Sequence, residues 1–324
     1  GGQVGDKGYI ENAGGKTAVI DTRKENELTL HIVKQLPSDP DKTFRMVVDK
    51  KKRLATEANH TATHLLHHAL RQVLGTHVEQ KGSYVNDEKL RFDFSHPSKL
   101  TDEEIRQVER IVNAAIREDY SLEDFRNIPI AEAREMGAMA LFGEKYGDMV
   151  RCVRFGESIE LCGGTHAKST GQIGMINIMS ETAVAAGVRR IEAVTGEVCE
   201  EYFNAVADTM KEIRSCFAAS PNIVQSIKKL IEEDAELRAD LEKLKREKAL
   251  QLAELLKKKI EKVGTIDYLE TDCGDFTPEM IKDIAFKFKN EYGRICFAAY
   301  GTQNGKVNLT LMLGDDLVAE GKDA

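Results

Sequence analysis

Two pairs of side chains that can bind a metal, each with an offset of four residues, constrain this sequence more than any other feature. His60 and His64 form one pair, and Cys162 and His166 form the other, about a hundred residues further along. Imidazole nitrogen and thiolate are the ligands that zinc prefers, and four of them complete its usual tetrahedron. We therefore expect the central part of the chain to fold around a metal that joins two distant segments.

The first pair lies in a segment with a helical pattern. Residues from about Asp49 to Leu74 contain neither glycine nor proline, and the segment ends at Gly75. Side chains four residues apart lie on the same face of a helix, with Cβ atoms roughly 5–6 Å apart, which suits chelation of one cation. Taken alone, the pair is weak evidence, because exposed helix histidines would look the same. Thr61 also excludes the His-Glu-x-x-His motif of zinc proteases.

The second pair makes the metal interpretation stronger. Cys162 and His166 enclose Gly163 and Gly164, which allow a sharp turn that directs thiolate and imidazole to the same side. The glycines also leave backbone N–H groups that a substrate carbonyl or phosphate can approach. The alternative interpretation of Cys162 is a buried free thiol. A four-ligand zinc has no open position, so the metal either admits a fifth ligand or only positions a substrate.

Composition indicates a soluble globular protein of two or three domains. Of the 324 residues, 41% are hydrophobic and 31% are charged, and the net charge is −8. The apolar runs are too short to cross a bilayer and no signal segment opens the chain. The six cysteines show no disulfide spacing, so we expect a cytoplasmic protein. Nucleic-acid binding would need local basic runs such as residues 50–53, 189–190 and 257–259.

Hydrophobic periodicity and turn residues divide the chain into four regions and predict an α+β fold. Residues 1–48 predict a small β-barrel-like subdomain, and residues 49–196 an α+β domain that holds both ligand pairs. Residues 197–263 predict a helical hairpin or coiled-coil arm, for which an ordinary packed helix is the alternative. Residues 264–324 predict a small, truncated α/β domain. The chain begins inside a glycine-containing turn, so we expect it to be a fragment of a longer protein.

Several segments together resemble the editing domain of bacterial alanyl-tRNA synthetase. The likeness is most specific in residues 1–195, weaker after residue 200, and covers essentially the whole chain. The segments that carry it are Gly1–Asp6, His60–His67, Gln80–Ser83, Arg91–His96, Ala138–Tyr146, Cys162–His166 and Gly187–Val194.

The resemblance implies an aminoacyl-tRNA deacylase that hydrolyses Ser-tRNA(Ala) and Gly-tRNA(Ala), with one Zn²⁺ per chain. It implies His60, His64, Cys162 and His166 as the zinc ligands, and Thr63, Gln80 and Cys162 as catalytic residues. It places Thr63, Gln80, Gly163, Gly164 and Arg189 at the substrate. The partner implied is mischarged tRNA(Ala), and the C-terminal region of the family can mediate a homodimer.

Physical reasoning agrees with a second, hydrolytic site. A hydrophobic pocket discriminates poorly between amino acids that differ by one small group, so editing is needed. Thr63 could hydrogen-bond the hydroxyl of serine, which alanine lacks, although a threonine bonded to its own helix backbone is the alternative. The sequence contains no ATP-binding or amino-acid-activating motif, so ATP and Mg²⁺ would serve only the aminoacylation domain of the parent ligase. The glycine-rich segment expected near the end of the family's last domain is also missing.

Other interpretations remain open at this stage. The chain could be a freestanding deacylase of the same superfamily, and the threonyl-tRNA synthetase editing domain shares some of these motifs. It could also be a non-catalytic tRNA-binding and dimerisation module with structural zinc, or a metallohydrolase of small esters. The tRNA specificity of hydrolysis would separate these.

Overall fold

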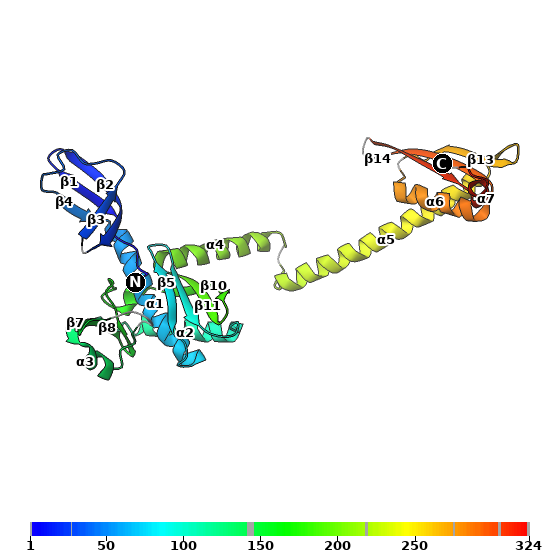
Figure 1. Ribbon diagram of the computed structural model, residues 1–324. Helices are drawn as coiled ribbons and strands as arrows, with labels where there is room; N and C mark the ends of the chain where they lie inside the picture. The colour runs from blue at the N-terminus through cyan, green and yellow to red at the C-terminus, as the bar shows by residue number, and fades with distance from the viewer. Residues whose placement is uncertain are drawn as a thin grey trace. The chain divides into compact units, whose positions relative to one another are not determined.

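The computed structural model describes residues 2–26, 28–140, 146–217, 220–274, 276–303 and 306–322 (Figure 1). The chain divides into two compact units, Gly1–Glu212 and Ile213–Ala324. Residues 141–145, which belong to one of the segments that carry the family resemblance, lie outside the described residues. The observed mixture of helices and sheets confirms the α+β class.

A four-stranded antiparallel sheet begins the first unit. Its strands are β1 (Gly8–Asn12), β2 (Gly15–Glu25), β3 (Leu28–Val33) and β4 (Arg45–Val48), in the order β3-β2-β1-β4. The turn between β1 and β2 uses Gly15 with a φ of 135°, a conformation that other residues rarely adopt. The expected β structure is present, but among the described residues β3 and β4 stay at opposite edges. The sheet is therefore open rather than a barrel.

Helix α1 (Lys50–Leu74) contributes the first ligand pair and is the central helix of the main core. The carboxylate of Asp49 caps its first turn by accepting a hydrogen bond from the backbone N–H of Lys52, and Gly75 ends it. Its middle turns are buried against α2 (Asp102–Arg117) and the sheet that follows. Thr101 and Glu104 form the capping box that opens α2.

The main sheet of the first unit is antiparallel, with the order β10-β11-β6-β5. These strands are β5 (Gln80–Val85), β6 (Leu90–Ser95), β10 (Ile176–Ala185) and β11 (Val188–Thr195). Phe92 and Phe94 of β6 are completely buried beneath α1 and α2. Residues 170–173 form a short 3-10 turn, and β10 begins at Ile176.

A smaller three-stranded sheet carries the second ligand pair. Its strands are β7 (Glu123–Pro129), β8 (Met149–Phe155) and β9 (Ser158–Leu161), in the order β7-β8-β9, and α3 (Ile130–Glu135) packs on it. Cys162 follows directly after β9. The end of this sheet therefore delivers the turn with the second pair to the side of α1.

Two helices occupy the region expected to be helical, α4 (Gly196–Ser215) and α5 (Ile223–Lys257). Their pairing as a hairpin or a coiled coil stays a prediction. In the second unit, α6 (Pro278–Glu291) connects two parallel strands and covers one face of a mixed sheet. That sheet has the order β12-β13-β14-β15 and consists of β12 (Glu261–Val263), β13 (Ile266–Asp272), β14 (Ile295–Gln303) and β15 (Lys306–Leu313), followed by α7 (Asp315–Ala319). Across the described ranges, none of the helices has the length and apolarity needed to cross a membrane.

Candidate metal centre

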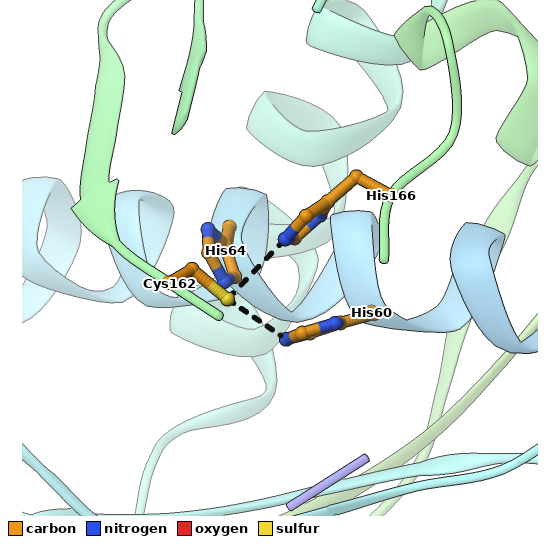
Figure 2. Close-up of side chains that lie close together, drawn as sticks. All are labelled: His60, His64, Cys162 and His166. Carbon is orange, nitrogen blue, oxygen red and sulfur yellow. Dashed lines mark hydrogen bonds between the residues drawn. The ribbon is translucent and has the colours of Figure 1, made fainter. Parts of the chain in front are cut away.

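The fold brings the two predicted ligand pairs together. Figure 2 shows the side chains of His60 and His64, from α1, pointing toward those of Cys162 and His166, from the turn after β9. Their potential ligand atoms all lie within 4.8 Å of one another. Sγ of Cys162 lies 3.5 Å from Nε2 of His60 and 3.3 Å from Nε2 of His166. Among the described residues these four form a group that could hold a metal ion.

Each imidazole has an oxygen atom of another residue close to its Nδ1 atom. Nδ1 of His60 lies 2.8 Å from Oε1 of Gln3, and Nδ1 of His166 lies 3.1 Å from Oγ1 of Thr61. Nδ1 of His64 lies 3.5 Å from a carboxylate oxygen of Glu160. A proton on Nδ1 leaves Nε2 with a free lone pair, which is the form of histidine that binds a metal. The surroundings of His60 therefore favour its metal-binding tautomer, because Oε1 of Gln3 can only accept a hydrogen bond.

Burial keeps the ligands neutral in the absence of a metal. It lowers the pKa of His60 to about 4 and that of His166 to about 2, and it holds the pKa of His64 well below its ordinary value. Burial also raises the pKa of the Cys162 thiol to about 11. Near neutral pH the imidazoles are thus ready to coordinate, whereas the thiol must lose a proton when a metal binds.

Glu160 is a buried carboxylate behind the centre. One of its oxygens lies 2.8 Å from Nδ1 of His67, in addition to its approach to His64. Burial opposes ionisation of Glu160, but the two histidines outweigh it and lower the pKa of the carboxyl group. Since an ionised carboxylate only accepts hydrogen bonds, the Nδ1 atom of His67 is the donor. Glu160 thus joins β9 to α1 behind the centre.

The turn between Cys162 and His166 is held by Arg151 from β8. The guanidinium of Arg151 donates to the carbonyl oxygens of Cys162 at 3.0 Å and Gly164 at 2.5 Å, and it pairs with Asp124. The backbone N–H of Gly164 donates to Sγ of Cys162 at 3.4 Å. Gly163 is exposed and its backbone meets no neighbouring side chain where a Cβ would stand.

A cavity of about 640 Å³ opens beside the centre. Its lining includes three of the four ligands, the predicted substrate residues Thr63, Gln80, Gly163 and Gly164, and also Gln3, Ser83, Arg151 and Glu160. Oγ1 of Thr63 donates to the carbonyl oxygen of Asn59 at 2.8 Å, so its hydroxyl is used by the helix backbone and can only accept from a ligand. Nε2 of Gln80 donates to Oγ of Ser83 at 3.3 Å.

Arg189 does not line this cavity, although we had placed it at the substrate. Its guanidinium forms a two-point ion pair with Glu181 of the neighbouring strand, at 2.5 and 2.6 Å. The pair lies in the hairpin of β10 and β11, where Arg189 is opposite Ala183. The structure therefore gives Arg189 a role in joining two strands.

Sequence reasoning did not identify Gln3, Glu160, Thr61 and Arg151 as parts of the centre. Glu160 did carry a signal, because it lies two residues before Cys162 on a short strand and so faces the same side. Gln3 was noted only as part of a motif at the start of the chain.

The comparisons with known proteins agree with this arrangement. A family model described as the threonyl and alanyl tRNA synthetase second additional domain matches residues 150–192, which contain Cys162 and His166. The alanine–tRNA ligases of Bacteroides thetaiotaomicron, Parabacteroides distasonis and Porphyromonas gingivalis are 51%, 50% and 48% identical to the chain. Each alignment covers 100% of this chain and 37% of the relative. The chain thus spans little more than a third of the length of these relatives, and the predicted resemblance to bacterial alanyl-tRNA synthetase is confirmed.

Proposed function

We propose that this chain, whose sequence is similar to a segment of bacterial alanine–tRNA ligases, is a zinc-dependent editing deacylase. It hydrolyses the ester of Ser-tRNA(Ala) and Gly-tRNA(Ala), while the parent ligase joins alanine to tRNA(Ala) with ATP and Mg²⁺. The observation that carries the proposal is the juxtaposition of the four-ligand group with a polar cavity.

His60, His64, Cys162 and His166 would hold one Zn²⁺. Three imidazoles and one thiolate fit zinc by ligand type, and the acceptors at Nδ1 supply the outer contacts that metal-binding histidines usually have. Zinc held in this way supplies a fixed positive charge and Lewis acidity at the wall of the cavity. Of the four ligands, Cys162 is the one that would lose a proton on binding.

The remaining cavity residues would bind and orient the aminoacyl ester. The turn at Gly163 and Gly164 leaves space for the ester because it carries no side chain. Gln80, at hydrogen-bond distance from Ser83, would orient the substrate and the attacking water by its amide group. Hydrolysis forms a bond between the water oxygen and the acyl carbon and breaks the ester bond to the tRNA ribose.

Thr63 would provide the preference for serine. Its proton is committed to the carbonyl of Asn59, so its oxygen can accept the hydrogen bond of a seryl hydroxyl. An alanyl ester offers no such donor. Glycine also lacks this hydroxyl, so Thr63 does not account for hydrolysis of Gly-tRNA(Ala).

The partner we propose is tRNA(Ala) in the cytoplasm, with a homodimer through the C-terminal region. The basic runs at residues 50–53 and 257–259 would contribute to phosphate contacts, although Lys51, Lys52, Arg53 and Lys257 each form an ion pair within the chain. Binding would therefore depend strongly on salt concentration.

Hydrolysis of Ser-tRNA(Ala) compared with Ala-tRNA(Ala), by chain with a measured zinc content, tests the proposal. We expect selective release of serine with about one zinc per chain, and loss of both zinc and hydrolysis in Cys162→Ala. Bound zinc and bound tRNA without hydrolysis would leave a binding module with a structural metal. Equal cleavage of a simple ester lacking tRNA would indicate a general metallohydrolase.

A further inference from the structure

The start of the chain is fixed against the sheet next to the metal centre. The backbone N–H of Val4 donates to the carbonyl of Val85 at 2.9 Å, and the N–H of Val85 donates to the carbonyl of Gly2 at 2.8 Å. A Cβ at Gly2 would lie 2.3 Å from two oxygen atoms of Ser83, so only glycine fits there. These contacts extend the edge of β5 by a short bridge and hold the intervening residue, Gln3, over the centre.

The amide of Gln3 is oriented by Thr165 in the ligand turn. Oε1 of Gln3 accepts from the backbone N–H of Thr165 at 2.9 Å, and Nε2 donates to Oγ1 of Thr165 at 2.7 Å. Since a backbone N–H can only donate, the oxygen of the amide must face it. The same oxygen lies 2.8 Å from Nδ1 of His60.

This arrangement determines which nitrogen of His60 carries its proton. The second group near Nδ1 of His60 is the carbonyl oxygen of Thr165, at 3.1 Å. Both neighbours are acceptors, so Nδ1 carries the proton and Nε2, which faces Cys162, keeps its lone pair. Gln3 also fixes the Thr165 residue that supplies the second acceptor.

We propose that Gln3 is a positioning residue of the metal centre, which holds His60 in its metal-binding tautomer and joins it to the ligand turn. This inference rests on the proposed function only for the presence of the metal. The three histidines would then each have a different outer partner: Gln3 for His60, Glu160 for His64, and Thr61 for His166. Of these three partners, Gln3 lies near the start of the chain, 162 residues before Thr165.

Three variants separate this role from simple packing. Gln3→Leu keeps the approximate size but removes both polar atoms. Gln3→Glu keeps the acceptor for His60 and for the N–H of Thr165, and the Thr165 hydroxyl can turn to donate to the new carboxylate. Gln172→Leu is the matched control, because Gln172 is exposed and its side chain accepts from the backbone N–H of Lys168, away from the centre.

The measurements are zinc affinity by competition with a chromophoric chelator and the absorption spectrum of the Co²⁺-loaded chain, which reports the coordination geometry. Outer partners of metal-binding histidines typically contribute about 10–100-fold to affinity. We expect Gln3→Leu to bind zinc about tenfold more weakly, since the carbonyl of Thr165 remains, with an altered Co²⁺ spectrum. Gln3→Glu and Gln172→Leu should stay within about threefold of the parent. Urea unfolding of the metal-free chains should be similar for all.

Two results would overturn the inference. One is a Gln3→Leu chain with the zinc affinity and Co²⁺ spectrum of the parent, and the other is an equal loss in Gln3→Leu and Gln3→Glu. Failure of the proposed function looks different. A parent chain that binds zinc but hydrolyses no aminoacyl-tRNA would refute the deacylase and leave this inference intact, whereas a parent chain that binds no zinc would refute both.

Discussion

Replacing Gly164 by alanine should displace a metal ligand, whereas the same change one residue earlier should not. A methyl group at position 164 would lie 2.2 Å from Cε1 of His60 and 2.6 Å from both Nδ1 of His60 and Oε1 of Gln3. Ordinary contact begins at 3.4 Å, so the ring or the turn must move by about 1.2 Å. At Gly163 an added Cβ meets no heavy atom within 4 Å, which makes Gly163→Ala the matched control.

The consequence for binding follows from the tolerance of the coordination bonds. Zinc–nitrogen bonds are about 2.0–2.1 Å long and vary by about 0.2 Å. A displacement several times larger removes His60 as a ligand and also separates it from Gln3. We expect Gly164→Ala to weaken zinc binding at least about 100-fold, or about 2.8 kcal/mol, and Gly163→Ala to change it less than about threefold.

Chelator competition on both variants measures the effect, and Co²⁺ absorption shows whether the geometry has changed. Urea unfolding of the metal-free chains shows whether the fold is kept. Zinc binding by Gly164→Ala as tight as that of Gly163→Ala would refute the reasoning, since it would mean that His60 is no ligand or that the turn relaxes without cost.

Four further predictions concern the metal, the pocket and the core. Because burial raises the pKa of the Cys162 thiol to about 11 and lowers the pKa of His60 to about 4 and of His166 to about 2, zinc binding should release one proton. Affinity should then rise tenfold for each unit of pH between about 6.5 and 8.5, and a slope of two or more would disprove neutral imidazoles. Removal of zinc by a chelator should lower the free energy of unfolding of the first unit by about 2.7 kcal/mol if the free zinc concentration was 100 times Kd. The urea midpoint of the first unit should fall accordingly, and that of the second unit should stay the same. Thr63→Val should slow hydrolysis of Ser-tRNA(Ala) about tenfold with zinc affinity unchanged; unaltered serine release would remove Thr63 from specificity. Phe92→Ala, at a completely buried position, should cost about 3–5 kcal/mol in equilibrium unfolding, and a cost below about 1 kcal/mol would contradict the described core.

Local signals in the sequence were sufficient for the longer helices and for the four side chains that could bind a metal. The segment before Gly75 lacks glycine and proline and is capped by Asp49, and Thr101 with Glu104 is a local capping pattern. Such elements depend on neighbours within a few residues. The two candidate ligand pairs could be recognised for the same reason, because each has a local offset that suits chelation.

What the sequence did not reveal depends on contacts between distant segments. Gly82 lies within β5 although glycine is uncommon in strands, and the pairing of β5 with β6 shifts register between Gln80 and Gly82. Arg189 forms an ion pair with Glu181 of the adjacent strand, a contact that depends on how the two strands pair. Gln3 and Thr165 are 162 residues apart in the sequence, so no local pattern could connect them.

The separation of the two ligand pairs also gives the centre an order of assembly. His64 leaves the ribosome before Cys162 does, because Cys162 is 98 residues further along the chain. At a synthesis rate of about 5–20 residues per second, this is a delay of about 5–20 s. During that time the nascent chain offers only a two-histidine chelate. A complete centre can exist only after β9 has joined α1, so metal capture would mark the moment at which the domain has closed.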